Sequence, residues 1–333
     1  MRKKFILFLF TLIFLTAVQP GELYSSGKVV RIGYLGNEQF SSRLDAAGKD
    51  LLDELRKLGW IEGQNIVIEQ RYWENRVDRL IDQAVEFVRL RVDIIVTSTG
   101  TGAQIAKKAT TVIPIVMVSS ADAVTQGLAN SLAHPGGNVT GLTSSSTWVT
   151  GKQFELIKEA FPKTSRVAFV RCGGSKTGPS NPGLGKKQWN EAQDAARVQK
   201  IRLLPVAMPG PGAVEDPLEI TGRERLDALA VADCVTVSAR ELIELAARSR
   251  LPAIYPLSRF VRQGGLMSYG ADQRESYRRA GQFVDKILKG ANPAELPIEQ
   301  PTKFEFVINL KTARQFGVTI PPEVLMWANE VIK

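Results

Sequence analysis

The chain has 333 residues, which is long enough for two domains of ordinary size, each with its own hydrophobic core. Apolar residues make up 44% and charged residues 23%, which excludes a disordered or low-complexity chain. The formal net charge is +9, but the lysines and arginines are scattered along amphipathic segments, without a basic block or interleaved aromatic residues. The charge therefore predicts a solvated basic surface and no nucleic-acid partner.

The N-terminal segment differs in composition from the rest of the chain. Three basic residues precede an apolar run from Phe5 to Val18, which is short for a membrane-spanning helix and typical of a signal-peptide core. Small residues at positions 25–27 offer a cleavage site. We therefore expect residues 1–27 to be a signal peptide that directs export to the periplasm or another extracytoplasmic space, or an uncleaved N-terminal anchor. Removing this segment takes away three basic residues and one acidic residue and leaves a net charge of +7.

From Val29 onward, short apolar runs alternate with segments whose apolar residues have the three- and four-residue spacing of a helix. This regular alternation predicts β-α units and a parallel, doubly wound sheet. The predicted strands of the first half are residues 29–36, 65–73, 93–99, 113–120 and 138–144. The predicted helices are residues 41–59 and 78–92, a helix from Gly102, and residues 124–132.

The same alternation restarts after a predicted helix at residues 151–161. The sequence therefore predicts an α/β fold of two similar lobes, each with a parallel doubly wound sheet, joined by a hinge near residues 140–150. We expect residues 28–145 to form the first lobe and residues 146–270 the second. Residues 271–333 are expected to complete the lobes with a long helix, a strand and a short helix that cross back between them. The predicted strands of the second half are residues 165–171, 201–208, 233–239, 251–257 and 265–270.

Histidine and cysteine are too rare to suggest catalysis or metal binding. His134 is the only histidine and lies beside Pro135, Gly136 and Gly137, so we expect a turn there. The sequence contains no GxSxG elbow, no GxxxxGK[ST] loop and no complete GxGxxG fingerprint. We therefore expect no catalytic residue, no metal and no cofactor. The two cysteines, Cys172 and Cys234, permit one disulfide but do not require it.

Small hydroxyl residues follow three successive strands of the first predicted lobe. Ligands bind beyond the carboxyl ends of the strands in such sheets, where helix N-termini present backbone N–H groups. The segment from Thr99 to Gly102 could bind a carboxylate, and Asp122 could accept a hydrogen bond from an ammonium group. The alternative is that each hydroxyl residue only caps a helix. The candidate residues of this lobe are Thr99, Gly100, Thr101, Ser119, Ser120, Asp122 and Thr143.

Two tyrosines lie at strand ends of the second predicted lobe. Tyr255 and Tyr269 could stack on a ligand or hydrogen-bond to it, and filling the core is an equally open role.

Several stretches resemble one protein family, among them "PGGNVTG" at residues 135–141, "GGLMSYGAD" at residues 264–272 and "KILKGANPAELPIEQPTKFEFVINLKTA" at residues 286–313. From about Val30 to Pro322 the chain resembles ABC-transporter substrate-binding proteins of the family that includes importers for tryptophan and other aromatic amino acids. The resemblance implies a type I periplasmic binding protein fold, with two Rossmann-like lobes that close over a ligand. In this chain it also implies ligand contacts from Asn181, in an Asn-Pro loop, and from Ser238 and Tyr255 in the second lobe.

The resemblance and the polar strand ends predict the same function. We expect a monomeric extracytoplasmic receptor that traps a small polar ligand, such as an amino acid or a related carboxylate, and presents it to an ABC permease. The sequence leaves two alternatives open. One is an α/β enzyme, a hydrolase or a transferase, that uses the same cleft. The other is a sensory binding module without a transporter.

Overall fold

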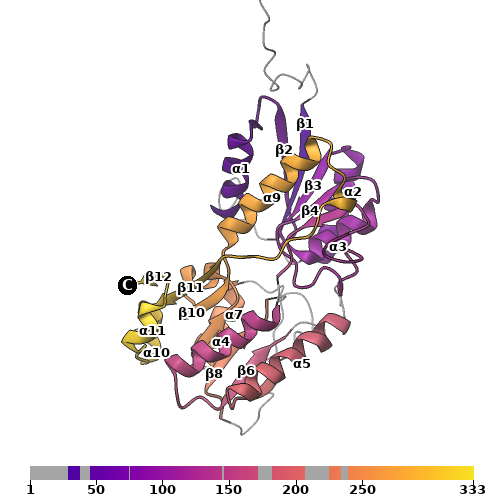
Figure 1. Cartoon of the computed structure of the whole chain (residues 1–333). Coiled ribbons are helices and arrows are strands. Elements are labelled where there is room, and N and C mark those ends of the chain that lie inside the picture. Colours follow the sequence, from indigo (N-terminus) through magenta and orange to yellow (C-terminus); the bar gives the residue numbers. More distant parts are fainter. Residues whose placement is uncertain are drawn as a thin grey trace, which may run out of the picture.

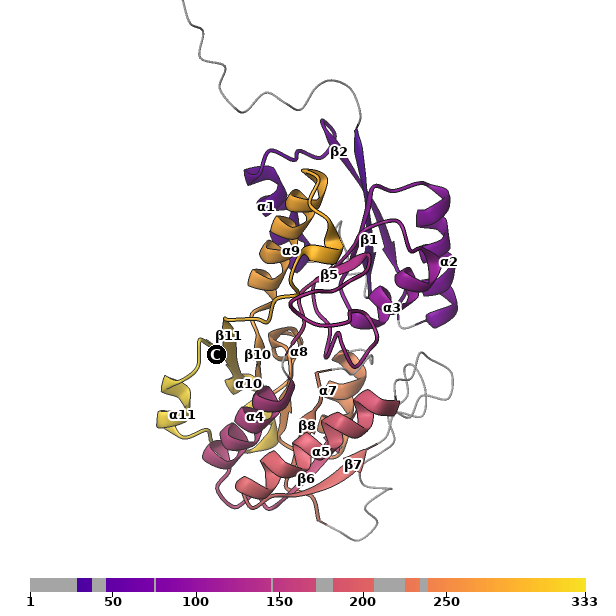
Figure 2. The same ribbon diagram turned by 45° about the vertical axis from the view of Figure 1, so that its right-hand side comes forward.

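The computed structural model describes residues 29–37, 46–74, 76–144, 146–171, 182–206, 225–233 and 239–333. Figures 1 and 2 show two α/β lobes stacked on each other, with the chain passing between them in the middle of the molecule. The expectation of an α/β fold with two sheets is confirmed.

The first lobe is built on a sheet of five parallel strands in the order β2-β1-β3-β4-β5. Helices cover both faces of this sheet, and its strands β3 and β4 are buried along their whole length, as expected for strands covered on both sides. Its elements are β1 (Val30–Gly36), α1 (Ala46–Lys57), β2 (Ile66–Tyr72), α2 (Val77–Arg89), β3 (Ile94–Thr97), α3 (Gly100–Ala109), β4 (Ile115–Met117) and β5 (Val139–Gly141).

The second lobe contains a seven-stranded sheet in the order β12-β11-β10-β9-β8-β6-β7. All neighbouring strands are parallel except β10 and β11, which are antiparallel. The elements up to the end of β10 are α4 (Ser146–Ala160), β6 (Arg166–Val170), α5 (Pro182–Val198), β7 (Arg202–Val206), β8 (Ala228–Val231), α7 (Ala239–Arg248), β9 (Ala253–Tyr255), α8 (Ser258–Arg262) and β10 (Met267–Ala271). The chain later returns to this lobe with β11 (Phe304–Asn309), α10 (Leu310–Phe316), α11 (Pro322–Met326) and β12 (Glu330–Ile332).

Between these two passages the chain completes the first lobe with α9 (Gln273–Leu288) and the short 3-10 helix η1 (Pro293–Glu295). In both ribbon views α9 runs from the hinge along α1 of the first lobe, although β10, which precedes it, belongs to the second lobe. Its apolar face joins the core against α1, and the Tyr277 hydroxyl lies 2.8 Å from the Tyr34 hydroxyl. The Trp60 indole N–H donates to Asp285 at 2.9 Å. Burying this apolar face drives the return of the chain to the first lobe.

The chain therefore crosses between the lobes three times, and the crossings are joined by backbone hydrogen bonds. The Glu299 N–H donates to the Gly141 carbonyl at 2.9 Å, and the Thr143 N–H donates to the Glu299 carbonyl at 2.9 Å. The Asp272 N–H donates to the Lys303 carbonyl at 3.0 Å. These bonds form a narrow hinge through which the lobes are held together.

One predicted element is wrong, and another lies mostly outside the described residues. Residues 124–132 form turns and no helix, because Asp122 accepts hydrogen bonds from Thr125 and Gly127 then adopts φ +69°. Of the strand predicted at residues 233–239, Asp233 lies in a turn and Ala239 begins α7, and the preceding strand, β8, ends at Val231. Residues 234–238 lie outside the described residues. The turn expected around His134 is confirmed: the His134 N–H donates to Ser131 Oγ at 3.0 Å, and Gly136 adopts φ +71°.

The N-terminal apolar run lies outside the described residues. Within the described ranges, no helix combines the length and the apolar character needed to cross a membrane.

Gly141, at the end of β5, provides a test of the hinge packing. It adopts φ +121°, and a Cβ atom there would lie 2.2 Å from the Met117 carbonyl oxygen. We expect Gly141→Ala to lower the free energy of unfolding by about 3 kcal/mol or more, from backbone strain and overpacking together. Gly290→Ala is the matched control, because Gly290 also has positive φ (+99°) but nothing within 4 Å of its Cβ position. It should cost only about 1–2 kcal/mol. If denaturant unfolding shows the same loss of unfolding free energy for both variants, the close packing at Gly141 is contradicted.

Candidate functional site

The carboxyl ends of the two sheets face each other. β5 leads directly into the second lobe, so the carboxyl edge of the first sheet points toward that lobe. β10 leads into α9 of the first lobe, so the carboxyl edge of the second sheet points toward the first lobe. The loops that follow the parallel strands of both lobes therefore meet in one region, which we call the interlobe site. This is the position at which open α/β sheets bind ligands.

The N-terminus of α3 brings backbone donors to the interlobe site. Thr99 is the N-cap, and its hydroxyl accepts from the Gly102 N–H at 3.1 Å. Within the described residues, the N–H groups of Gly100 and Thr101 have no hydrogen-bond partner. The positive end of the helix dipole adds to these two donors, so this turn is suited to a carboxylate.

Ser120 and Thr143 form an internal network beside this turn. Both are buried; the Ser120 hydroxyl donates to Gln126 Oε1 at 2.8 Å, and the Thr143 hydroxyl accepts from the Ala123 N–H at 3.0 Å. These bonds fix the loop after β4, which replaces the predicted helix. Ser119, by contrast, is partly exposed at the start of the same loop.

Asp122 joins the two lobes. Its carboxylate forms an ion pair with Lys187 of α5 and also accepts from the N–H and the hydroxyl of Thr125, at 2.9 and 2.8 Å. Burial raises the pKa of Asp122, but the bonds from Lys187 and Thr125 outweigh it, so the pKa lies below its ordinary value. The same ion pair raises the pKa of Lys187. A ligand ammonium at Asp122 would have to share the carboxylate with Lys187.

A second carboxyl group reaches the interlobe site from the second lobe. Asp233 lies two residues beyond β8, and the hydroxyl of Ser144, in the first chain crossing, donates to it. Burial raises the pKa of Asp233, although the Ser144 bond and the positive charge of Arg259 favour the ionised form. Sequence reasoning missed Asp233 because it assigned this residue to a strand. It also missed Lys187, because nothing in a helix pattern indicates a partner on the other lobe.

The two candidate tyrosines pack against aromatic residues of the second lobe. Tyr255 is 1% exposed, stacks on Phe260 with ring centroids 5.1 Å apart, and lies against Gly265 at the amino end of β10. Burial raises the pKa of its hydroxyl. Tyr269 packs on Phe304 and near Trp148, at the first turn of α4 beside the hinge. Asn181, Ser238, Cys172 and Cys234 lie outside the described residues.

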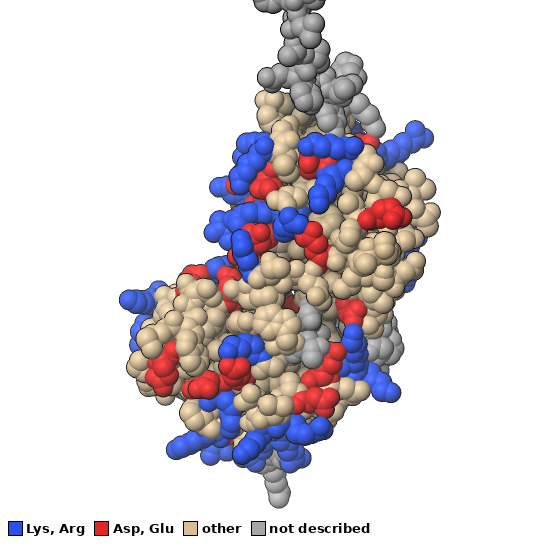
Figure 3. Space-filling view, in the orientation of Figure 1, with Lys and Arg blue, Asp and Glu red and all other residues tan. Residues whose placement is uncertain are grey.

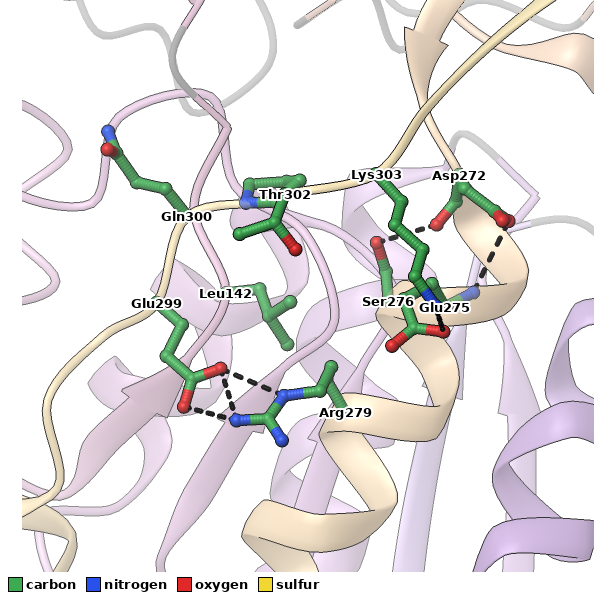
Figure 4. A pocket seen from close by; sticks show the side chains of 10 residues that line it. Leu142, Asp272, Glu275, Ser276, Arg279, Glu299, Gln300, Thr302 and Lys303 are labelled. Carbon is green, nitrogen blue, oxygen red and sulfur yellow. Dashed lines mark hydrogen bonds and ion pairs between the residues drawn. The ribbon is translucent and has the colours of Figure 1, made fainter.

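A pocket of about 270 Å³ lies at the hinge, between the start of α9 and the returning segment at residues 299–303. Figure 4 shows that its charged side chains pair with one another: Arg279 with both oxygens of Glu299, and Lys303 with Glu275 at 3.1 Å. None of the predicted site residues lines it. These pairs tie the returning segment to α9 and neutralise Glu299 and Glu275, whereas Asp272 caps α9 by accepting from the N–H groups of Arg274 and Glu275.

Positively and negatively charged side chains are mixed on the surface. On the face drawn in Figure 3, basic and acidic side chains are interspersed over both lobes. Within the described parts of the chain, no group of three or more His, Cys, Asp or Glu residues could hold a metal ion.

Comparison with known proteins identifies the family. Residues 41–332 match the family described as ABC transporter substrate binding protein. The chain belongs to this family. The expected resemblance is thereby confirmed over most of the chain, and the members of the family are binding proteins.

Individual relatives agree with this assignment. A tyrosine-binding protein of Clostridioides difficile (strain R20291) is 27% identical over 274 residues, which cover 81% of this chain and 76% of the relative. A Streptococcus pneumoniae ABC domain in complex with L-Trp has a TM-score of 0.77 and is 25% identical, covering 91% of this chain and 99% of that one. A conserved domain protein of Vibrio cholerae has a TM-score of 0.78 and is also 25% identical, covering 91% of this chain and 100% of that one. The type I periplasmic binding protein fold is confirmed.

The ion pair between Asp122 and Lys187 gives a prediction about this family member in solution. In Lys187→Gln the pKa of Asp122 should rise toward its ordinary value, which a carbon-detected NMR titration of the carboxyl group measures. Because the lowered pKa belongs to the folded protein, the stabilisation is present at neutral pH and is lost as the pH falls through that pKa. The Lys187 side chain is 49% exposed, so the free energy of unfolding should change by less than about 1 kcal/mol.

Lys186→Gln is the matched control, since Lys186 is an exposed neighbour on the same helix. It should leave the titration of Asp122 unchanged. The same Asp122 pKa in both variants would mean that the lobes do not meet at this contact in solution.

Proposed function

We propose that the protein is the extracytoplasmic receptor of an ABC importer and that its ligand is an α-amino acid. It binds the ligand between its lobes and presents the closed form to a permease in the membrane, as a monomer and without chemical turnover. Residues 1–27 serve as its export signal or membrane anchor. Hinge closure of this kind requires only a few kcal/mol of preferential binding to the closed form.

The observation that carries the proposal is the N-terminal turn of α3. Its two unpartnered N–H groups lie at the interlobe site, where a carboxylate would find backbone donors and the positive end of a helix. Carboxyl groups from both lobes, at Asp122 and Asp233, also lie at the interlobe site, where a ligand ammonium would share them with Lys187 and with the charge of Arg259. A zwitterionic amino acid has both groups. The printed ligands of two relatives, tyrosine and L-Trp, make aromatic amino acids the first candidates.

The first test is a thermal-shift screen of the purified protein against the amino acids, short carboxylates, purines and sugars. A ligand at about 100 times its Kd should add roughly 2.7 kcal/mol to the free energy of unfolding. We expect stabilisation by L-tryptophan or L-tyrosine. A folded protein that no amino acid stabilises would overturn the amino-acid proposal, and turnover of any stabilising compound would favour the enzyme alternative.

The role of α3 is tested at Gly100, the first residue of the helix. Proline is tolerated at this position, and the extended conformation of Thr99 (φ −139°, ψ 154°) suits a residue that precedes proline. Gly100→Pro removes one N–H donor and keeps the helix. It should weaken amino-acid binding by roughly 10- to 100-fold, the effect of losing a hydrogen bond to a charged group.

Gly100→Ala is the control for this change, because its Cβ atom meets the same neighbour, Gln126 Oε1, at 2.6 Å but the N–H remains. The comparison of the two Kd values, measured by calorimetry, isolates the contribution of the N–H group. Equal Kd values would show that the ligand carboxylate does not bind at this turn.

A further inference from the structure

A second pocket lies in the second lobe, at the edge of the sheet opposite the interlobe site. Its volume is about 500 Å³, which is within the range of small-molecule sites. The turn after α7 and the residues before β10 line it, and both precede parallel strands at the amino edge of the sheet. α10 lines it as well, because β11 is antiparallel to β10 and delivers α10 to that same edge. We call this cavity the α7–α10 pocket.

Much of the α7–α10 pocket is lined by apolar side chains. They are Ile243, Ala246, Ala247, Tyr255, Leu266 and Phe316. Thr312 also lines the pocket, but its hydroxyl already donates to the Gly264 carbonyl at 2.8 Å. Tyr255 and Leu266 are each 1% exposed, so core packing fixes this part of the wall. Such a wall favours a ligand with an apolar body over a simple ion.

The charged residues of the α7–α10 pocket are both arginines. Arg250 follows α7, and Arg314 lies in the last turn of α10. Both side chains are exposed, and neither guanidinium group forms an ion pair or a hydrogen bond with another described residue. No carboxylate of the described residues lines the pocket. The mouth of an apolar cavity therefore has two positive charges without a counter-charge.

The helix ends beside these arginines do not neutralise them. α7 and α10 both end at the pocket, and a helix C-terminus is equivalent to roughly half a negative elementary charge. Two such ends offset about one of the two positive charges and leave about one. The carbonyl groups of these ends are also capped without side chains, because the N–H groups of Arg250 and Leu251 bond to the last turn of α7 and that of Gly317 bonds to the last turn of α10. The guanidinium groups are thus available to an anion.

We propose that the α7–α10 pocket is a second ligand site, separate from the interlobe site, and that it binds a small amphiphilic anion, a carboxylate or phosphate on a short apolar body. The apolar body lies against the wall between α7 and α10, and the anionic group contacts Arg250 and Arg314. All lining residues belong to the second lobe, so the pocket is present whether the lobes are open or closed. The inference is independent of the proposed function, and binding here requires no amino acid in the interlobe site.

The test uses octanoate, which has a carboxylate and an apolar chain, and octan-1-ol, which has the chain without the charge. Ile243 gives a local readout in the full protein labelled with carbon-13 at the isoleucine δ1 methyl groups, and Ile243→Val assigns its NMR signal. We expect octanoate to shift the Ile243 signal in a saturable way. Octan-1-ol should bind at least about 10-fold more weakly, because it cannot form charge-assisted bonds to the arginines.

Two double variants separate the pocket arginines from the general basic charge of the lobe. Arg250→Gln with Arg314→Gln should weaken octanoate binding by about 10-fold and leave octan-1-ol binding unchanged. Arg248→Gln with Lys311→Gln is the matched control, because these exposed residues lie on α7 and α10, remove the same charge and do not line the pocket. It should bind octanoate as the wild type does.

Three results would overturn the inference. They are an Ile243 signal that does not respond to octanoate, equal binding of octanoate and octan-1-ol by the wild type, and equal octanoate binding by the two double variants. None of these results bears on amino-acid binding between the lobes, which the thermal-shift screen tests separately.

Discussion

The structure depends on the backbone hydrogen bonds of Glu299 to the crossing that follows β5. A single residue of the returning segment donates to Gly141 and accepts from Thr143, and its side chain forms a bidentate pair with Arg279 of α9. Two crossings and the helix that completes the first lobe are thereby joined at one position. Neither lobe is a continuous stretch of chain, so each can be complete only when these crossings are in place.

This connectivity also determines where the site lies. Because the chain leaves the first sheet at the carboxyl end of β5 and leaves the second at the carboxyl end of β10, both sets of strand-end loops are directed at each other. The Ser144 hydroxyl, which follows the first sheet, and the Asp233 carboxyl of the second lobe meet for that reason. The side chains of the strand-end loops could differ widely between proteins of this connectivity, and the loops would still lie in the same region.

The sequence predicted the lobes well because their pattern is local. Alternation of apolar strands and amphipathic helices is visible within windows of about 15 residues, and parallel sheets follow from it. The helix predicted at residues 124–132 failed because a side-chain bond from Thr125 to Asp122 and a left-handed Gly127 favoured turns over weak helix propensity.

The site was predictable only in part. The hydroxyl-rich strand ends could be read from the sequence, and the structure places Thr99 and Gly100 as a capped helix start. The partners across the lobes could not be read, because Asp122 and Lys187 are 65 residues apart and Ser144 and Asp233 are 89 apart. Only the folded hinge brings these pairs together. Tyr255 shows another limit of the sequence. An aromatic residue at a strand end has the same sequence pattern whether its side chain points into a binding site or into the core, and Tyr255 is buried.

The interlobe contacts differ in strength, and that difference bears on how a ligand can control closure. The Lys187 side chain is about half exposed, so its pair with Asp122 contributes little and is easily exchanged for water. The contact between Ser144 and Asp233 is more enclosed, because Ser144 is buried; its hydroxyl bond and the positive charge of Arg259 both favour the ionised carboxylate. The two contacts between the lobes therefore differ in how readily water can replace them. A ligand that binds groups of both lobes stabilises the contact between them and gains nothing when the lobes separate, and such differential binding is the requirement for a ligand to shift the equilibrium.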